Sequence, residues 1–403
     1  METGSGGGAR ETVCDRAAEL PLKINDPASA ERRDSGRPDI IRSIYVGTTR
    51  RHNPAGEGDR RMRLVRALAL LALLAAASCT GSPPGSIALS QDQPFRIRSS
   101  AVPFKLDDAA ATRVGRLVWR GGVSLSGNSE QFGGWSDLDV APDGSRLSAV
   151  SDVGGWMTAA IDYDARGNLG GLSEGRFGQL RGLDGQPLAA KRDADAEAMV
   201  RLPDGSWLVG FEQRHRIWRY PPGDEAAGEG LAGIPIQVEG PPQLQRQPSN
   251  GGMEAMTRSR DGRIVLMSEE HSEAAGTTMG WIGVPLGNGY LWSSFRYATI
   301  PDFRVTSMAR LADGSFVTLE RAFDMLRGVR VRVMQFDAAQ LASGGAVTAQ
   351  ELARLALPYA VDNLEAVATT SGRRGETLLW LLSDDNFNKF QRTLLLLFEL
   401  AAP

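Results

Sequence analysis

The chain has 403 residues, of which 42% are hydrophobic and 23% charged, and its formal net charge is −3. A mildly acidic chain is a poor partner for nucleic acid, because phosphate backbones demand a basic surface. Its two cysteines, Cys14 and Cys79, both precede the region that the repeat described below marks as folded. We therefore expect neither a disulfide framework nor a thiolate metal site in that region.

Residues 62–78 have the composition of an export signal: a methionine, Arg63 and Arg66, and an apolar run far shorter than the ~20 residues that span a bilayer. The residues that end at Cys79 resemble a lipobox. We expect lipidation of Cys79 and an exported, periplasmic or cell-surface protein whose lipid anchor is its only membrane attachment; a plain cleaved signal is the alternative. Residues 1–61 are charged and Gly-rich, which indicates a start site assigned too early or a disordered leader.

Residues 79–95 are rich in Ser, Pro and Gly and predict a flexible tether, followed by one folded domain at 96–403. In that domain a pattern recurs: a short apolar strand, a tight Asp-Gly turn, and a second apolar strand that ends in an acidic residue. Asp-Gly is a strong hairpin signal because both residues tolerate positive φ. The turn glycines, 52 to 61 residues apart, are Gly144, Gly205, Gly262 and Gly314, with Gly372 in a degenerate fifth copy.

A repeat of this length with several strands per unit is the signature of a β-propeller, each unit forming one blade. We predict an all-β fold and a single, monomeric propeller of five or six blades, with six favoured because about 310 residues are available at roughly 55 per blade. The apolar segment 393–400 is expected to close the ring by pairing with a strand from 114–123. A β-sandwich or two β domains would not explain a repeat that spans the whole domain.

Each repeat carries acidic residues at two positions, one before the first strand and one at the end of the second. The start of one strand and the end of the next lie at the same edge of a hairpin, so propeller symmetry should gather both sets around one mouth of the channel. The first set comprises Asp137, Glu197, Glu254 and Glu365, with Thr306 in the fourth copy. The second set comprises Asp152, Glu212, Glu269, Glu320 and Asp384.

So many carboxylates repel one another unless a cation, a basic partner or hydrogen bonds offset their charge. Oxygen-only ligands favour Ca²⁺, which we predict as the cofactor. The candidate ligands are Asp137, Glu197, Glu254, Glu269 and Glu365. The alternative is that these acids bond backbone amides and arginines as structural links between blades.

Basic and polar residues follow the second acidic position in several repeats. Arginine grips phosphate or carboxylate through a planar fork, so the mouth is predicted to take a small anionic or ester substrate; ion pairing with the acids is the alternative. The candidate catalytic residues are Glu212, Arg214, His215 and Arg321. The candidate ligand-binding residues are Asp152, Arg216, His271, Glu320, Asp384, Asp385 and Asn386.

Several segments resemble the phytase-like family named for the esterase-like activity of phytase. They include GGWSDLDVAPDGSRLSAVSD at 133–152, NGGMEAM at 250–256 and LLSDDNFNKFQRTLLLLFEL at 381–400. The resemblance covers nearly all of residues 95–400 and implies an exported bacterial propeller. The nearest string to the Asp-Asp-Pro-Ala-x-Trp motif of calcium-dependent propeller phytases begins at Asp107 and lacks the proline and the tryptophan, so no catalytic residue is carried over.

Three functions fit these residues. In the first, a hydrolase of phosphoesters or carboxylic esters, mouth Ca²⁺ polarises the ester, Arg214 and Arg321 stabilise developing charge, and His215 or Glu212 moves the proton. The second is a non-catalytic propeller at the cell envelope that binds a ligand or a protein through the mouth. The third is a lactonase similar to calcium-dependent six-bladed lactonases.

Overall fold

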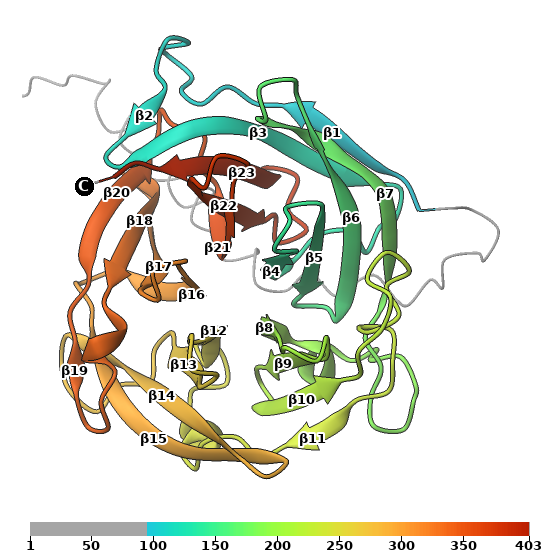
Figure 1. Cartoon of the computed structure of the whole chain (residues 1–403), viewed down its shortest axis with the longest axis vertical. Helices are drawn as coiled ribbons and strands as arrows, with labels where there is room; N and C mark the ends of the chain where they lie inside the picture. The colour runs from blue at the N-terminus through green and yellow to red at the C-terminus, as the bar shows by residue number, and fades with distance from the viewer. Residues whose placement is uncertain (1–94, 403) are drawn as a thin grey trace, which may run out of the picture. The chain divides into compact units, whose positions relative to one another are not determined.

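A computed structural model describes residues 95–402. The predicted leader, the export signal, Cys79 and all of the tether except Phe95 lie outside the described residues. Within residues 95–402, no helix is long and apolar enough to cross a membrane. The described part of the chain folds into five sheets arranged around a central channel as the blades of a β-propeller (Figure 1).

Blades one and two each have four antiparallel strands, ordered outward from the channel as they occur in the chain. Blade one comprises β4 (Trp135–Val140), β5 (Arg146–Ser151), β6 (Gly155–Tyr163) and β7 (Leu169–Gln179). Blade two comprises β8 (Ala196–Arg201), β9 (Trp207–Phe211), β10 (Arg216–Tyr220) and β11 (Ile236–Val238). The short helix α2 (Lys191–Ala194) joins them, and the 3₁₀ turn η2 (Leu244–Arg246) follows blade two.

Blades three and four follow the same plan with longer outer strands. Blade three comprises β12 (Met253–Arg258), β13 (Ile264–Ser268), β14 (Thr277–Leu286), β15 (Gly289–Ala298) and β19 (Ala346–Val347). Blade four comprises β16 (Arg304–Arg310), β17 (Phe316–Asp324), β18 (Gly328–Phe336) and β20 (Gln350–Ala356). The 3₁₀ turn η3 (Ala338–Gln340) precedes β19, which leaves blade four to pair in parallel with β15.

Blade five joins the two ends of the described chain. It comprises β21 (Asn363–Ser371), β22 (Thr377–Asp384), β23 (Thr393–Leu400), β3 (Leu117–Gly127) and β1 (Ile97–Ala101), with β2 (Arg113–Val114) paired to β3. The apolar strand β23 pairs antiparallel with β3, from Thr393 opposite Leu125 to Leu400 opposite Leu117. The predicted closure of the ring by the two terminal regions is confirmed.

The propeller has five blades in the described residues. The prediction of five or six blades is therefore confirmed, but the preference for six was wrong. The five innermost strands contact one another in a closed circle, β4 with β8, β8 with β12, β12 with β16, β16 with β21, and β21 with β4. The residues that were counted toward a sixth blade instead form β1, β2 and β3, which enlarge blade five. Each of the five sequence repeats therefore supplies one blade.

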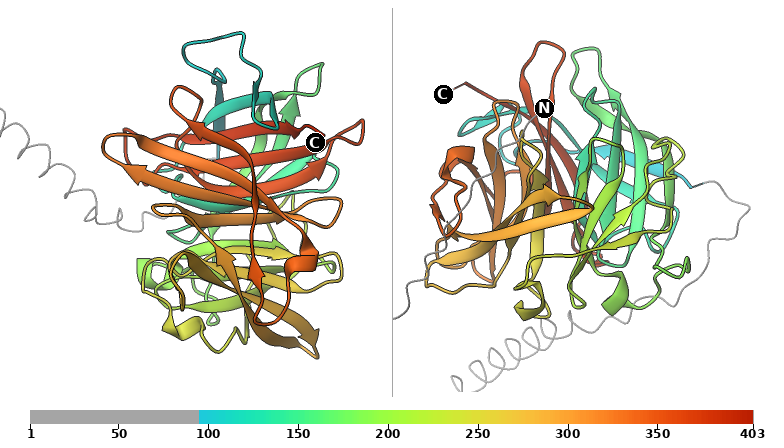
Figure 2. Two further views of the ribbon diagram at one scale, coloured as in Figure 1. Left: turned by 90° about the vertical axis from the view of Figure 1, so that its left-hand side faces the viewer. Right: turned by 60° about the horizontal axis from the view of Figure 1, so that its bottom comes forward.

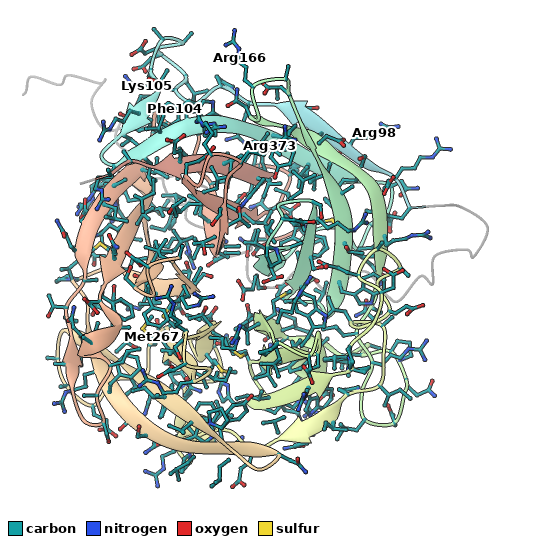
Figure 3. All side chains as sticks on the ribbon, viewed as in Figure 1. Arg98, Phe104, Lys105, Arg166, Met267 and Arg373 are labelled. Carbon is teal, nitrogen blue, oxygen red and sulfur yellow. The ribbon has the colours of Figure 1, made fainter. Side chains whose placement is uncertain are left out.

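Five hydrophobic clusters hold the ring together, one between each pair of neighbouring blades. Their side chains fill the spaces between the sheets (Figure 3). Met267, labelled in that view, is fully buried in the cluster between blades three and four, where it packs with Phe295 and Phe316. Because no cysteine lies in the described residues, this packing is the main source of stability.

The strands run from one end of the channel toward the other (Figure 2). One end, here called the turn end, is surrounded by the hairpin turns between the first two strands of the blades, because Pro142, Pro203, Ala312 and Ser371 line one cavity there. In blade five the turn glycine is Gly375, with φ of 81°, in place of the expected Gly372. The opposite end is here called the mouth, and it contains the starts of the innermost strands.

Candidate functional site at the channel mouth

The innermost strand of every blade contains a β-bulge at the same place. Its register with the neighbouring strand shifts by one residue there in all five described blades. A bulge leaves the extra residue unpaired and re-aims its side chain. The bulged residues are Ser136, Glu197, Glu254, Thr306 and Glu365. Three of the four acids predicted for this position occupy it, and in blade one Ser136 stands where Asp137 was expected.

In each blade, one residue of the second strand pairs with the residue just before the bulge of the innermost strand. The second acidic position comes directly after that paired residue in the chain. Those paired residues are Ser151, Phe211, Ser268, Glu320 and Ser383. The equivalent residues one step further along the chain are Asp152, Glu212, Glu269, Arg321 and Asp384. Blade four thus presents Thr306 and Arg321 where blades two and three present two glutamates, and Glu320 lies one residue away from the ring.

Asp137 lies deeper in the channel and is used as a structural link. Its Oδ2 accepts a hydrogen bond from the Met199 backbone at 2.7 Å, and its Oδ1 accepts from the Leu138 backbone at 2.9 Å. The hydroxyl of Ser307, in blade four, donates to Oδ1 at 3.3 Å. One carboxylate therefore joins blades one, two and four, which matches the structural alternative and not the predicted role of a metal ligand.

Glu320 is also satisfied inside the fold. Its Oε1 accepts from the Tyr297 hydroxyl at 2.8 Å, and its Oε2 accepts from Arg332 at 2.6 Å. Only 1% of the Glu320 surface is exposed. The structure places this residue between blades three and four and does not bring it to the mouth.

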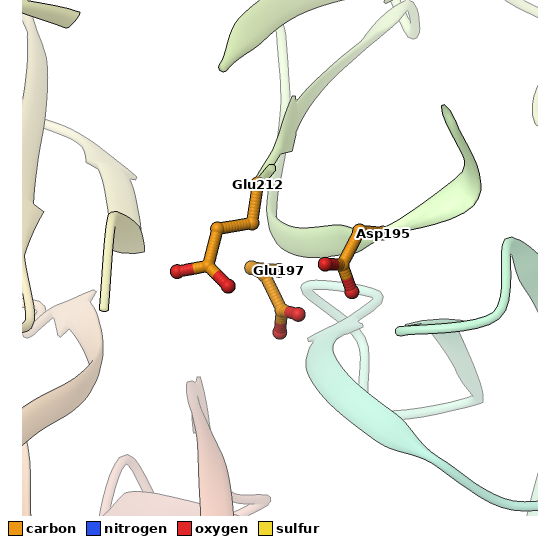
Figure 4. A group of neighbouring side chains, drawn as sticks. All are labelled: Asp195, Glu197 and Glu212. Atoms are coloured by element: carbon orange, nitrogen blue, oxygen red, sulfur yellow. The ribbon is translucent and has the colours of Figure 1, made fainter. Parts of the chain in front are cut away.

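Three carboxylates of blade two come together at the mouth. Asp195, Glu197 and Glu212 each offer an oxygen within 4.8 Å of the others, and Figure 4 shows Glu197 between its two neighbours. Asp195 was not predicted because it precedes β8 and has no equivalent in the repeat. The Asp-x-Glu spacing of residues 195 and 197 is the signal that could have found it, since side chains two apart in an extended chain share a face.

Glu212 is held in a fixed position next to an acid of the neighbouring blade. Its Oε1 accepts hydrogen bonds from the backbone of Gly251 at 2.6 Å and Gly252 at 2.5 Å. Burial raises the pKa of Glu212, and the neighbouring carboxyl of Glu254 opposes part of that rise. Burial raises the pKa of Glu254 well above its usual range, and the charges of Glu269 and Glu212 add to the shift. Glu254 therefore holds its proton more tightly than Glu212 does.

Two basic side chains offset part of the negative charge of the mouth. The Lys191 ammonium lies 2.5 Å from Asp195 Oδ1 and 2.7 Å from Asp152 Oδ2. The Arg321 guanidinium lies 3.0 Å from Glu365 Oε1 and 3.8 Å from Glu269 Oε1. The substitution of arginine for an acid in blade four thus supplies a counter-charge to its neighbours on both sides.

The remaining acids of the mouth hold their protons more tightly than free carboxyls do. Burial raises the pKa of Glu197 well above its usual range, and the charges of Glu254 and Asp195 add to the shift. Burial likewise raises the pKa of Asp384. It raises the pKa of Glu365 to about 7, against the opposing effect of Arg321. Glu197, Asp384 and Glu365 therefore ionise at higher pH than free carboxyls do.

This donor set fits a hard divalent cation. All three clustered groups offer carboxylate oxygens, which are the ligands that Ca²⁺ prefers. Within the described residues Glu197 forms no hydrogen bond and no ion pair. Asp152 Oδ1 is buried and has no hydrogen-bond partner among the described residues. Buried carboxylates are normally paired, so oxygens left over in this way are consistent with a cation.

The predicted arginines after Glu212 turn away from the mouth. The Arg214 side chain is 58% exposed and its guanidinium lies 2.6 Å from Asp193. The Arg216 guanidinium stacks over Phe211 at 3.9 Å and over Trp218 at 4.2 Å. Among the described residues, neither guanidinium forms an ion pair with the carboxylate cluster.

Both histidines of the folded domain pack behind the mouth. His215 is buried, and its Nε2 lies 2.8 Å from the carbonyl oxygen of Pro248. A side chain at Gly252 would meet the His215 ring, so this histidine supports the backbone that binds Glu212. His271 stacks on Trp281 with the rings 6.3 Å apart and 9° from parallel.

The loop after β22 connects blade five to blade one at the mouth. Asp384 accepts from the Asn386 backbone at 2.7 Å, and Asp385 accepts from the Gly134 backbone at 3.2 Å. Asn386 and Phe387 are both left-handed, with φ of 48° and 50°. Asp384 lies at the mouth, whereas Asp385 and Asn386 shape this loop.

Comparisons with known proteins give one family match. The model of the family described as "Phytase-like: Esterase-like activity of phytase" matches residues 130–387, a span that includes all five bulges and every mouth residue named above. No curated protein matches the chain.

Solved structures also show similarity at low identity. A candidate gluconolactonase is 13% identical, with 75% of this chain and 94% of that chain covered and a TM-score of 0.36. A glucose dehydrogenase is 14% identical, with 73% and 92% covered and a TM-score of 0.34. The β-propeller domain of Cps50 (Swd1) from Myceliophteria thermophila is 8% identical, with 74% and 99% covered and a TM-score of 0.33.

Proposed function

The chain belongs to the phytase-like family (esterase-like activity of phytase), and on that premise we propose that it is a hydrolase that cleaves phosphoesters or carboxylic esters at the channel mouth. The observation that carries this proposal is the position of Glu197, which forms no hydrogen bond within the described residues, beside Glu212, which neighbours the buried carboxyl of Glu254. A cation-binding group and a proton-transfer group therefore lie next to each other.

Asp195 and Glu197 would hold a divalent cation, for which we propose Ca²⁺, and Glu212 beside them would serve proton transfer. When bound, Ca²⁺ supplies positive charge that polarises an ester oxygen and acidifies a water molecule. The need for such charge follows from the mouth itself, where Lys191 and Arg321 face a larger number of carboxylates. A phosphoester would be repelled by these acids without an added cation.

The Glu212–Glu254 pair is the candidate acid and base. Burial raises the pKa of both carboxyls, and that of Glu254 more strongly, so Glu212 would accept a proton from water while Glu254 would donate one to a leaving group. The backbone N–H groups of Gly251 and Gly252 orient Glu212. Arg321 places a positive charge on the same rim, where developing negative charge would be stabilised.

The test is turnover by purified protein with four substrates: phytate, p-nitrophenyl phosphate, p-nitrophenyl acetate and a lactone, each with Ca²⁺ and with EDTA. We expect Ca²⁺-dependent hydrolysis of at least one ester. Glu197→Gln should abolish the dependence on Ca²⁺, and Glu212→Gln should lower kcat about 10²-fold or more, as loss of a general acid or base does. The control is Glu174→Gln, because Glu174 is exposed on β7 and paired only with Arg146.

The outcomes separate the candidate functions. Hydrolysis of the lactone alone would assign lactonase activity. Binding of Ca²⁺ by calorimetry without turnover of any substrate would favour a non-catalytic propeller that binds a ligand or protein at the mouth. The same melting temperature in EDTA and in millimolar Ca²⁺, together with no calorimetric binding, would contradict the cation site.

We also propose that the protein acts as an exported monomer that is anchored to a membrane through a lipid on Cys79. This proposal rests on the composition of residues 62–79. In Cys79→Ser the protein should leave the membrane fraction while the propeller keeps its melting temperature. Membrane association that is unchanged in this variant would contradict the anchor.

A further inference from the structure

The turn end of the channel carries a second set of repeated residues. The innermost strands of blades two, three and four each end in arginine, two residues after a methionine. These pairs are Met199 with Arg201, Met256 with Arg258, and Met308 with Arg310. The three arginines occupy equivalent places in consecutive blades, so they lie together at the end of the channel opposite the mouth, and all three line the same cavity.

The first of these arginines is neutralised. Arg201 Nε lies 3.3 Å from Asp139 Oδ2, and its other guanidinium nitrogen pairs with Glu225. Two acids of the inner strands, Asp137 and Asp139, line this cavity; Asp139 is occupied by Arg201, and Asp137 accepts hydrogen bonds from the backbone of Met199 and Leu138. The charge of Arg201 is therefore balanced within the fold.

The other two arginines lack an acidic partner. Within the described residues neither Arg258 nor Arg310 forms an ion pair, and the one hydrogen bond of the Arg310 guanidinium goes to the backbone oxygen of Arg258, at 3.1 Å. Both side chains are half-buried. Burial lowers the pKa of Arg310, and the positive charges of Arg258 and Arg260 lower it further. Two like charges thus face each other without compensation.

A cavity of about 590 Å³ lies between these side chains. Its wall includes Met256 and Met308 next to the arginines, the hydroxyl-bearing residues Thr257 and Thr369, and the two acids that are already engaged within the fold. This volume is in the range of small-molecule pockets, which combine apolar walls with a few polar groups. Two guanidinium forks above thioether side chains suit a ligand with an anionic head group and an apolar body.

We propose that the turn end of the channel binds a small organic anion, with its phosphate or carboxylate group held by Arg258 and Arg310 and its body packed against Met256 and Met308. The anion supplies the counter-charge that these arginines lack in the fold. A nucleic acid is a poor occupant, because the chain is acidic overall and the cavity lies within the channel. This site is separate from the mouth and does not depend on the proposed hydrolase activity.

The test is the melting temperature of the full chain in rising concentrations of inorganic phosphate and of citrate, with sodium chloride at equal ionic strength as the reference. Phosphate or citrate should raise the melting temperature of the native protein above the chloride reference. The increment should vanish in the double variant Arg258→Gln and Arg310→Gln. It should persist in the matched control Arg219→Gln, since Arg219 lies toward the same end but is paired with Asp204.

A second variant guards against a folding defect. Arg310→Lys keeps the charge but loses the planar fork, so calorimetry should show phosphate affinity lowered about tenfold, equal to about 1.4 kcal/mol. An increment that survives in the double variant and disappears in Arg321→Gln would place the anion at the mouth and overturn the proposal. The proposal is likewise overturned if neither phosphate nor citrate exceeds chloride with the native protein.

Discussion

The two ends of the channel are built by the same repeat, but the mouth gathers acidic side chains and the turn end gathers arginines. At the mouth, bulged residues such as Glu197 and Glu254 gather carboxyls whose pKa values burial raises, and Lys191 and Arg321 offset part of the charge. At the turn end, Arg258 and Arg310 face each other without an acidic partner in the described residues. The repeat fixes the backbone, whereas the side chains differ between the two ends. Each end therefore suits a ligand of the opposite charge.

The two ends of the channel also differ in how deeply their charged side chains are buried. The mouth is buried, so its acids respond by raising their pKa values and by pairing with buried bases. The arginines of the turn end are only half-buried and partly hydrated, so they keep their charge at a small cost. We therefore expect large stability effects at the mouth and small ones at the turn end.

The largest effect is expected for Arg321→Met. Removal of this guanidinium leaves Glu365 and Glu269 without their shared cation, and breaking a buried ion pair costs about 3 to 5 kcal/mol. Chemical denaturation at pH 8 in EDTA should show this loss in the free energy of unfolding. Arg321→Lys, which keeps the charge, should lose less. A loss below ~1 kcal/mol in Arg321→Met would mean that solvent already screens these acids.

The second effect is a dependence of stability on pH in calcium-free protein. The pKa of Glu365 is about 7 in the fold against 4.5 as its ordinary value. Below pH 4.5 this carboxyl is protonated in both states, and above pH 7 it is ionised in both. Between these values the native state binds more protons, so the free energy of unfolding falls by about 3 kcal/mol as pH rises.

Urea denaturation between pH 4.5 and 7.5 measures this slope. Glu365→Gln is the control, because glutamine does not titrate and the variant should lose most of the fall contributed by this residue. Neighbouring acids, Glu254 and Glu269, keep a part of the slope in both proteins. Equal slopes in the native protein and the variant would show that Glu365 ionises as a free carboxyl does.

The propeller and its closure could be predicted from the sequence, whereas the membership of the mouth could be predicted only in part. Asp-Gly turns and apolar strands repeat clearly, and β23 is apolar at nearly every position. The predicted ring takes, in each repeat, the acidic residue that lies nearest to the end of a strand. In a strand, a shift of one residue moves a side chain to the other face, so Asp137 and Glu320 were assigned to the mouth although Ser136 and Arg321 occupy it.

The missing information was the β-bulge. In blade two, the mouth residues Glu197 and Glu212 lie eight residues before and seven residues after the turn glycine. The same count in blade four leads to Thr306 and Arg321. That regularity was present in the chain, but the acid at position 320 obscured it. Asp195 lies outside the repeat and required the structure. Blade number also depended on pairing, because three strands before the first repeat enlarge an existing sheet.

A third prediction concerns Asp137, the acid that joins blades inside the channel. Asp137→Asn replaces one acceptor oxygen with a donor, so the N–H of Met199 loses a partner at a cost of about 2 kcal/mol. The increase in melting temperature on addition of Ca²⁺ should be unchanged, because this residue is not in the carboxylate cluster. Differential scanning calorimetry with and without Ca²⁺ measures both quantities. Loss of the calcium increment in this variant would return Asp137 to the set of metal ligands.

The smallest effect, and the one of opposite sign, is expected for Arg310→Gln. Removal of this charge relieves its repulsion with Arg258 and Arg260, so the variant should be more stable than the native protein by about 0.5 kcal/mol at low ionic strength. The gain should shrink as sodium chloride rises toward 1 M, where the Debye length is about 3 Å. Chemical denaturation at several salt concentrations measures it. A variant that is less stable than the native protein at every salt concentration would mean that the Arg310 hydrogen bond to the Arg258 backbone matters more than the repulsion, and the turn end would then be balanced without an anion.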